Sequence, residues 1–495
     1  MADGSLRDEF RSAPPAQRWA LGALIAIGVA SRLAHLRQPM RHDEAYTFLQ
    51  YASAPLSSAL SDYTYPNNHL FHTLLVWLTT RLLGGSPGAI RLPAFVAGIL
   101  ILPAVYLLAR RLADREASLT ALALASAWPA LVLYSTNARG YSIIALAFVG
   151  LLLLGERVIE EASPWTWLWI GVVIAVGAYT APVMLYPAGS ALMWIGAETW
   201  RRRGWSALRR TGRHALAAIV LAGIGVALAY LPAIRRSGLA AVIANKYVTA
   251  LSPAALVAAL PEFAVDVVVS LGLGLPLPVL AVLATAGVAA IAIPGPDRMR
   301  RLTLASSVLG WCALLLLVTR RPPPSRVWLF LVPVACVYVA IGLSLGARWL
   351  GRRAQIGLRT SAVLAVTLAA AIGTWALVTR PVFRSPETGT LADAPDIARY
   401  LLATLRPGDR VVVVSPGDAP LDYYLRRLGG RSLAAINDSA GRGGVFVVVN
   451  PRHLQTLAGM QGAVRGIPWS ELQQHAEPAR FPLASVYEFR SASSP

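Results

Sequence analysis

The feature of this sequence that most constrains its fold is a series of apolar runs, each close to the length that crosses a lipid bilayer. An α-helix needs about 20 apolar residues for that crossing. The chain has 495 residues, of which 56% are hydrophobic and 14% charged, far from the average of soluble proteins. We therefore expect an α-helical integral membrane protein with about eleven transmembrane helices. The predicted spans are 19–33, 92–108, 118–134, 142–154, 165–179, 183–197, 215–234, 273–293, 302–318, 327–345 and 361–378.

One apolar run is expected not to cross. The run 69–83 carries two histidines, three threonines and an arginine, which favours a helix that lies at the membrane interface. The first run, 19–33, follows a polar N-terminus and lacks a cleavage site for a signal peptidase, so it is expected to stay in the membrane as a signal anchor.

The basic residues indicate orientation. Lys and Arg number 45 against 25 Asp and Glu, a net charge of +20. This excess lies between the apolar runs, a pattern that reports membrane topology and argues against a nucleic-acid partner. With the N-terminus inside and 69–83 not crossing, most arginine clusters fall on the cytoplasmic side. These clusters are 110–115, 201–213, 298–301 and 348–359.

The residues after Thr379 have the composition of a soluble domain. Helices are expected at 395–405, 420–428 and 452–460, and strands at 411–414, 445–449 and 485–489. Alternating helices and strands predict a small α/β domain, and the continuous valines of 445–449 predict a strand buried on both faces. The expected domains are 1–384, with an outer loop at 37–90, and 385–495. Cys312 and Cys336 lie inside apolar runs, where neither a disulfide framework nor a thiolate metal site is expected.

The candidate chemistry begins at Asp43 and Glu44, directly after the first span. Carboxylates at the edge of an apolar span are costly to desolvate and are usually kept for a function. The alternative is an acidic pair that caps a surface helix. Adjacent acids cannot point the same way on a helix, so we expect one to be a general base and the other a supporting group. The outer loops also carry Arg139, Lys246 in the predicted outer segment 235–270, and Arg326 at the end of the loop 320–326. These cations are suited to a lipid phosphate.

Five features together resemble the GT-C glycosyltransferases, in the branch that contains protein O-mannosyltransferases and lipid A aminoarabinose transferases. They are the acid after the first span, the helix-rich first outer loop, the segment Pro66-Asn67-Asn68-His69-Leu70, the entry Arg91-Leu92-Pro93 and the turn Ala138-Arg139-Gly140-Tyr141. The resemblance implies a sugar donor linked to polyprenyl phosphate, transfer on the periplasmic face of a bacterial inner membrane, and inversion by direct displacement. The 37–90 loop and the C-terminal domain would then be periplasmic.

The resemblance also implies roles for single residues. Asp43 is similar in position to the catalytic acid, with Glu44 beside it, and Arg139, Arg326 and Lys246 are expected to hold the donor phosphate. The residues expected to contact the acceptor or the sugar are His42, Tyr46, Asn68, His69 and Tyr141. Arg139 has the alternative of reaching lipid headgroups, and Asn68 that of capping the helix that follows.

Two departures leave the sugar and the acceptor open. Aminoarabinose transferases often have Lys-Pro-Pro where this chain has Pro66-Asn67-Asn68, and several relatives place an aspartate where this chain has Tyr141 and Ser142. The DxD patterns of metal-using relatives are absent from the sequence, so no obligatory metal is expected, although His42 beside Asp43 leaves room for a divalent ion. A lipid-linked sugar transporter or a non-catalytic polymer-assembly scaffold remains the alternative to a transferase.

Overall fold

The computed structural model describes residues 11–491 except 12, 162, 244–247, 296, 351–356, 442 and 465. The chain divides into two compact units. The helical unit comprises Met1–Leu36, Leu60–Gly84 and Gly88–Ser385, and the α/β unit comprises Arg37–Ala59, Gly85–Pro87 and Pro386–Pro495. The segment that carries Asp43 and Glu44 is thus grouped with the C-terminal segment.

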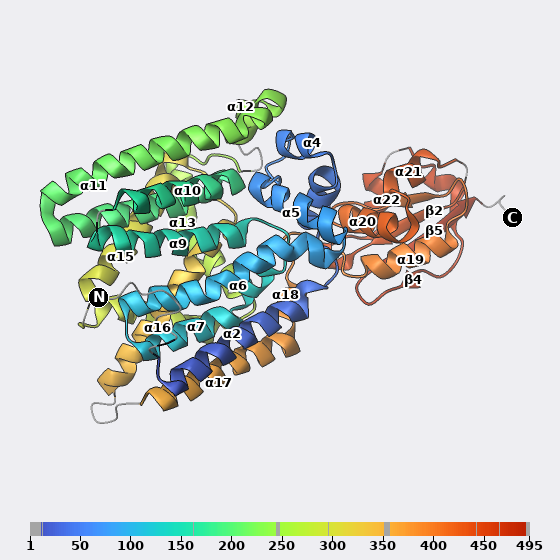
Figure 1. Cartoon of the computed structure of the whole chain (residues 1–495). Coiled ribbons are helices and arrows are strands. Elements are labelled where there is room, and N and C mark those ends of the chain that lie inside the picture. The colour runs from blue at the N-terminus through green and yellow to red at the C-terminus, as the bar shows by residue number, and fades with distance from the viewer. Residues whose placement is uncertain are drawn as a thin grey trace. The chain divides into compact units, whose positions relative to one another are not determined.

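The helical unit consists of long apolar helices (Figure 1). Among the described residues, eight helices are long and apolar enough to cross a membrane, or nine if the bent pair α7 and α8 is one span. This confirms the predicted class of helical membrane protein. The helices are α2 (Pro15–Leu36), α5 (Leu70–Leu83), α6 (Pro87–Leu112), α7 (Arg115–Ala127), α8 (Pro129–Ser135), α9 (Tyr141–Glu160), α10 (Pro164–Thr180), α11 (Leu185–Ser237), α12 (Leu239–Ile243), α13 (Pro253–Gly272), α14 (Leu277–Ala292), α15 (Arg298–Thr319), α16 (Leu331–Leu350), α17 (Leu358–Thr379) and α18 (Pro381–Arg384).

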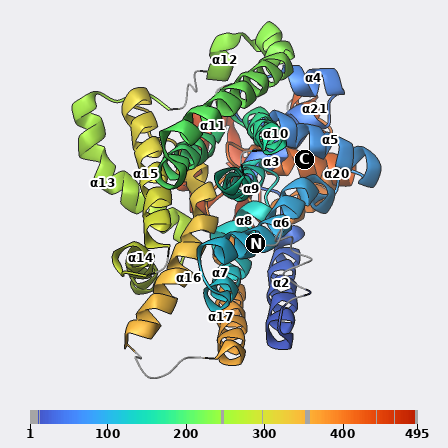
Figure 2. The same ribbon diagram turned by 60° about the vertical axis from the view of Figure 1, so that its left-hand side comes forward.

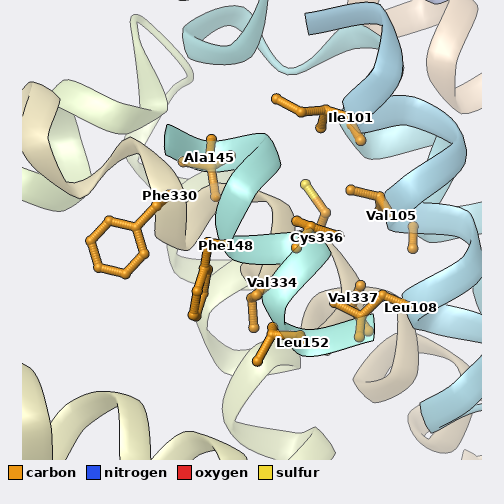
Figure 3. Packing of buried hydrophobic residues seen from close by; sticks show 14 of the residues in the cluster. Ile101, Val105, Leu108, Ala145, Phe148, Leu152, Phe330, Val334, Cys336 and Val337 are labelled. Carbon is orange, nitrogen blue, oxygen red and sulfur yellow. The ribbon is translucent and has the colours of Figure 1, made fainter. Parts of the chain in front are cut away.

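Much of the core of this unit is one apolar cluster shared by many helices. Helices α2, α7 and α17 contact one another, and α14 packs along α16 (Figure 2). At the centre, Phe148 and Leu152 of α9 lie beside Cys336 and Val337 of α16 (Figure 3). Cys312 and Cys336 are buried free thiols, in agreement with their positions inside apolar runs.

The break between α7 and α8 is stabilised by a buried arginine. Pro129 starts α8, and Trp128 before it is extended, so carbonyls at the end of α7 lose their helical partners. Arg32 of α2 is fully buried and donates to the Ser126 carbonyl at 3.0 Å and the Gly28 carbonyl at 2.9 Å. This guanidinium therefore has a structural role.

The segment 235–270, predicted as an outer loop, instead contains α13, a helix long and apolar enough to span. The Leu251 amide before α13 donates to the Arg320 carbonyl at 2.8 Å, and Arg298 Nε donates to the Ile291 carbonyl near the end of α14 at 2.8 Å. Because α15 runs from Arg298 to Thr319, α13 and α14 in series return from one end of α15 to the other. The 298–301 cluster and the 320–326 loop lie at opposite ends of α15.

Two predicted spans, 183–197 and 215–234, lie in the single element α11. Gly204 between them has φ 74°, a backbone conformation that bends the helix there.

The α/β unit is built on a mixed sheet in the order β1-β2-β5-β3, with β4 paired to β5. Strand β2 pairs parallel with β1 and antiparallel with β5. All five residues of β2 are buried, as predicted from the valine run. The strands are β1 (Arg410–Val412), β2 (Val445–Val449), β3 (Leu472–Gln474), β4 (Ala479–Arg480) and β5 (Ser485–Ser491); the helices are α19 (Ala394–Thr404), α20 (Asp418–Gly429), α21 (Leu433–Asp438) and α22 (Leu457–Ala463) (Figure 1).

The predicted helix 452–460 is wrong in its first half. Pro451–His453 forms a 3-10 turn, and α22 begins only at Leu457. Leu454 has φ 56°, so the chain cannot continue as a right-handed helix through it.

Three short elements complete the Asp43 region: α3 (His42–Thr47), the π-helical turn η1 (Phe48–Ala52) and α4 (Leu56–Ser61). Phe48 packs edge-on against Tyr423 of α20, with ring centroids 5.9 Å apart. The Tyr423 hydroxyl donates to the Gly85 carbonyl at 2.7 Å, which ties a second part of the first outer loop to α20.

Candidate active site

The two carboxylates at the start of α3 have different environments. The Glu44 side chain is fully buried, and its Oε1 accepts the Arg41 amide at 2.8 Å. This is the reciprocal contact of a capping box, so Glu44 caps the helix. Asp43 lies in the same first turn and is only partly buried. Of the pair, Asp43 is therefore the carboxylate that is more accessible to solvent.

The backbone of this segment is fastened to residues 387–390. The His42 amide donates to the Gly389 carbonyl and the Asp43 amide to the Thr388 carbonyl, both at 3.1 Å. Arg41 forms an antiparallel bridge with Thr390. The first backbone amides of a helix have no acceptor within the helix, and these bonds give two of them a partner.

His42 is held by the C-terminal part of the α/β unit. Its Nδ1 lies 3.1 Å from Asp418 Oδ1, and its ring stacks on Tyr46 with centroids 6.1 Å apart. Burial opposes a charge on the imidazole, but hydrogen bonding and attraction to Asp418, with a further contribution from Asp43, raise the pKa of His42 above its ordinary value. Both His42 and Tyr46, predicted to contact the acceptor or sugar, thus make contacts within the α/β unit.

In the helical unit, Arg139 and His69 come together. Arg139 Nη1 donates to the Asn67 carbonyl at 2.7 Å, and Nη2 lies 3.2 Å from His69 Nε2. The Gly140 amide donates to His69 Nδ1 at 2.9 Å. Burial, followed by the charges of Arg139 and neighbouring groups, holds the pKa of His69 well below its usual range. The neutral imidazole and the guanidinium therefore lie in direct contact.

Gly140 permits this approach. A Cβ at Gly140 would lie 2.8 Å from His69 Nδ1 and 2.3 Å from Thr180 Cγ2. The turn Ala138-Arg139-Gly140-Tyr141, noted as a motif in the sequence, is therefore glycine-dependent for a steric reason.

Arg326 joins the same group through Tyr141. Arg326 Nε donates to the Tyr141 hydroxyl at 3.1 Å, and the Tyr141 ring centroid lies 5.8 Å from Arg139 Cζ and 5.0 Å from the His69 ring centroid. We call Arg139, Arg326, His69 and Tyr141 the basic cluster. Its guanidinium, imidazole and phenol groups can present several N–H and O–H donors to an oxyanion such as a phosphate.

Asn68 has a structural position beside this cluster. Its Oδ1 accepts the Thr73 hydroxyl at 2.7 Å, and its Nδ2 donates to the Asp62 carbonyl at 2.7 Å. The amide thereby fastens the loop to the first turn of α5, whose N-cap residue is His69.

Asp266 in α13 was not among the candidates predicted from the sequence. Its Oδ2 accepts the hydroxyl of Ser325, the residue before Arg326, at 2.5 Å. A carboxylate inside an apolar run was the sequence feature that could have identified it.

Two further expectations concern Lys246 and metals. Lys246 lies outside the described residues. Within the part of the chain that the structure describes, no group of three or more His, Cys, Asp or Glu is arranged to hold a metal ion.

Residues 67–230 match the family model described as dolichyl-phosphate-mannose-protein mannosyltransferase. This range includes Asn68, His69, Arg139 and Tyr141. No curated protein matches the chain in sequence.

Solved structures of ArnT from Cupriavidus metallidurans are similar over nearly the whole chain. The form bound to undecaprenyl phosphate has a TM-score of 0.61 and 14% identity, covering 95% of this chain and 98% of that one. The apo form has a TM-score of 0.60 and 14% identity, covering 94% of this chain and 97% of that one. The chain therefore has the GT-C fold of membrane glycosyltransferases, as its sequence predicted.

Proposed function

We propose that this protein is an inverting glycosyltransferase that moves a sugar from a polyprenyl-phosphate donor to a lipid, glycan or protein acceptor on the periplasmic face. The observation that carries the proposal is the basic cluster, with Arg139 and Arg326 both in contact with the Tyr141 side chain. Such a donor set suits a phosphate monoester, and the GT-C fold is the one in which ArnT binds undecaprenyl phosphate.

In the proposed reaction the acceptor hydroxyl oxygen attacks the anomeric carbon while the bond from that carbon to the phosphate oxygen breaks. Asp43 accepts the hydroxyl proton as general base. The polyprenyl phosphate leaves with the bonding electrons, and Arg139 and Arg326 stabilise its growing charge. His69 and Tyr141 orient the two guanidiniums, and the cations need no metal to balance a monophosphate.

The remaining expected residues have supporting roles in this proposal. Glu44 caps the helix that carries Asp43, Asn68 fixes the loop before His69, and His42 and Tyr46 hold the Asp43 segment. Lys246 is proposed as a third phosphate contact on its sequence position alone.

The test begins with lipid that co-purifies with the full-length protein, identified by mass spectrometry. We expect a polyprenyl phosphate with the wild type and with Asp43→Asn, because the substitution leaves the phosphate cluster intact. Transfer of labelled sugar from a polyprenyl-phosphate donor to a membrane extract should fall about 10²- to 10⁴-fold in Asp43→Asn, the usual contribution of a general base.

The matched control is Asp396→Asn, a carboxylate in the first turn of another helix of the same unit. It should transfer at the wild-type rate. Wild-type transfer by Asp43→Asn would remove the carboxylate from the mechanism. Movement of the lipid-linked sugar across vesicles without any transfer would favour the transporter alternative.

A further inference from the structure

The C-terminal segment of the α/β unit carries no residue with a role in the proposed chemistry, yet its contacts converge on the Asp43 segment. The carbonyls of Thr388 and Gly389 accept the amides of Asp43 and His42. The Tyr424 hydroxyl accepts the Met40 amide at 3.2 Å. The chain at Met40, His42 and Asp43 is therefore anchored by residues more than three hundred positions away in the sequence.

We propose that the C-terminal α/β segment positions the general base, and that a clip between His42 and Asp418 is the contact that does so. Asp418 is a positioning residue in this proposal, because it touches His42 and acts on Asp43 through it. The inference rests on the proposed role of Asp43 and adds a role for the C-terminal segment.

Both residues of the clip are held in place for the contact. Asp418 starts α20, where helix amides stabilise a carboxylate, and its Oδ1 lies 3.1 Å from His42 Nδ1. When His42 is protonated, the clip is a charge-assisted pair.

Gly389 gives an independent indication that the chain is adapted to the contact between His42 and Asp418. Its φ is +70°, and a Cβ there would lie 2.8 Å from His42 Cβ and 2.5 Å from Pro416 Cβ. A side chain at this position would push His42 away from the 416–418 turn.

The clip has a defined pH dependence. The groups that face His42 are Asp418 of α20, Asp43 of its own helix, the Pro416 carbonyl and the Tyr46 ring. Pairing raises the pKa of His42 above its ordinary 6.5. The stabilisation that the charged pair gives the folded protein is therefore complete below pH 6.5 and is lost as the pH rises through the pKa that His42 has in the folded protein. The pKa of Asp418 is lowered: burial opposes this shift, but the pairing with His42 outweighs it, so the carboxylate stays ionised through this range.

Hydrogen exchange of the full-length protein tests the clip without any substrate. In Asp418→Asn, the amides of His42 and Asp43 should exchange on the order of tenfold faster than in the wild type, because a hydrogen bond to a charged group is lost. Asp396→Asn is the matched control and should leave these amides unchanged. Asp418→Glu keeps the charge and should restore most of the protection.

The pH profile separates a clip from a general loss of stability. After correction for intrinsic exchange, wild-type protection should decline as the pH rises above 6.5, whereas Asp418→Asn should show no such step. Unchanged exchange in Asp418→Asn, or the same pH step in both proteins, would overturn the inference.

Transfer measured in parallel distinguishes this inference from the proposed function. In Asp418→Asn we expect kcat to fall about tenfold with an unchanged KM for the donor, because the base is displaced while the phosphate cluster is intact. Full activity of Asp43→Asn would sink the proposed function. Loss of activity in Asp43→Asn together with wild-type kinetics in Asp418→Asn would sink only the positioning role.

Discussion

Asp43 and Glu44 are neighbouring carboxylates in one helical turn, yet their side chains have different environments. Successive residues on a helix point in different directions, so Glu44 turns inward to the Arg41 amide while Asp43 stays partly exposed. The sequence predicted that one would act and the other support, and the contacts assign the supporting role to Glu44.

This division gives a prediction for Glu44. Glu44→Gln keeps an oxygen that accepts the Arg41 amide, since Gln serves equally in a capping box, and should transfer sugar at the wild-type rate. Glu44→Ala leaves that buried amide without its acceptor and should destabilise the α/β unit by about 1–3 kcal/mol. Thermal unfolding and transfer of the two variants check this, and an inactive but stable Glu44→Gln would contradict it.

The basic cluster gives a prediction for replacing its arginines by lysine. Arg139→Lys and Arg326→Lys keep the charge but lose the planar fork that binds two phosphate oxygens. Each should raise the KM for the polyprenyl-phosphate donor on the order of tenfold and reduce the lipid that co-purifies.

The control for this experiment is Arg81→Lys, a cation over the Trp77 ring near the end of α5. It should leave donor binding unchanged. Equal loss of lipid in all three variants would point to general membrane attraction and not to a phosphate site.

At the level of elements, α14 and α16 approach closely because Gly342 lacks a side chain. A Cβ at Gly342 would lie 1.7 Å from the Ala286 carbonyl oxygen, whereas Gly346, one turn later in α16, has nothing within 4 Å. Small residues allow such close packing between membrane helices.

Gly342→Ala should therefore lower stability by about 1–3 kcal/mol, because the backbone of α14 must shift. Gly346→Ala meets open space and should be neutral or stabilise by about 0.5–1 kcal/mol through helix propensity. Thermal unfolding in detergent measures both, and an equal effect of the two substitutions would exclude the contact as the cause.

For the whole molecule, the predicted orientation can be tested by labelling single cysteines. Cys312 and Cys336 are 6% and 0% exposed, so neither should react with a membrane-impermeant maleimide in the folded protein. This low background allows single introduced cysteines to report sidedness.

Ala434→Cys in α21 should be labelled in intact spheroplasts, and Ser206→Cys in the arginine-rich segment of α11 only after lysis, because the positive-inside rule places that segment in the cytoplasm. Both positions are exposed. Labelling of Ser206→Cys in intact spheroplasts would reverse the proposed orientation.

The sequence by itself determined the class of protein and most of its elements. Length and hydrophobicity of each apolar run are local properties, so the helical membrane fold, the α/β segment and the fully buried strand β2 could be predicted. It missed α13, because two acids and two prolines within 253–272 resemble a loop when no neighbouring helix is known. It also identified Arg139, Arg326, His69 and Tyr141 as candidates, since charge and hydrogen-bonding chemistry are properties of residue type.

Only the tertiary structure decided which of these residues meet. Tyr141 joins the two arginines, Gly140 admits His69, and Asp418 pairs with His42 from the far end of the chain. Contacts between residues so distant in sequence depend on how the chain packs, and no local pattern specifies them. Folding buries those side chains away from water, where electrostatic interactions are strong. The distance of an ionised group from each neighbour then decides whether it caps a helix, pairs with a residue of another segment or faces a phosphate.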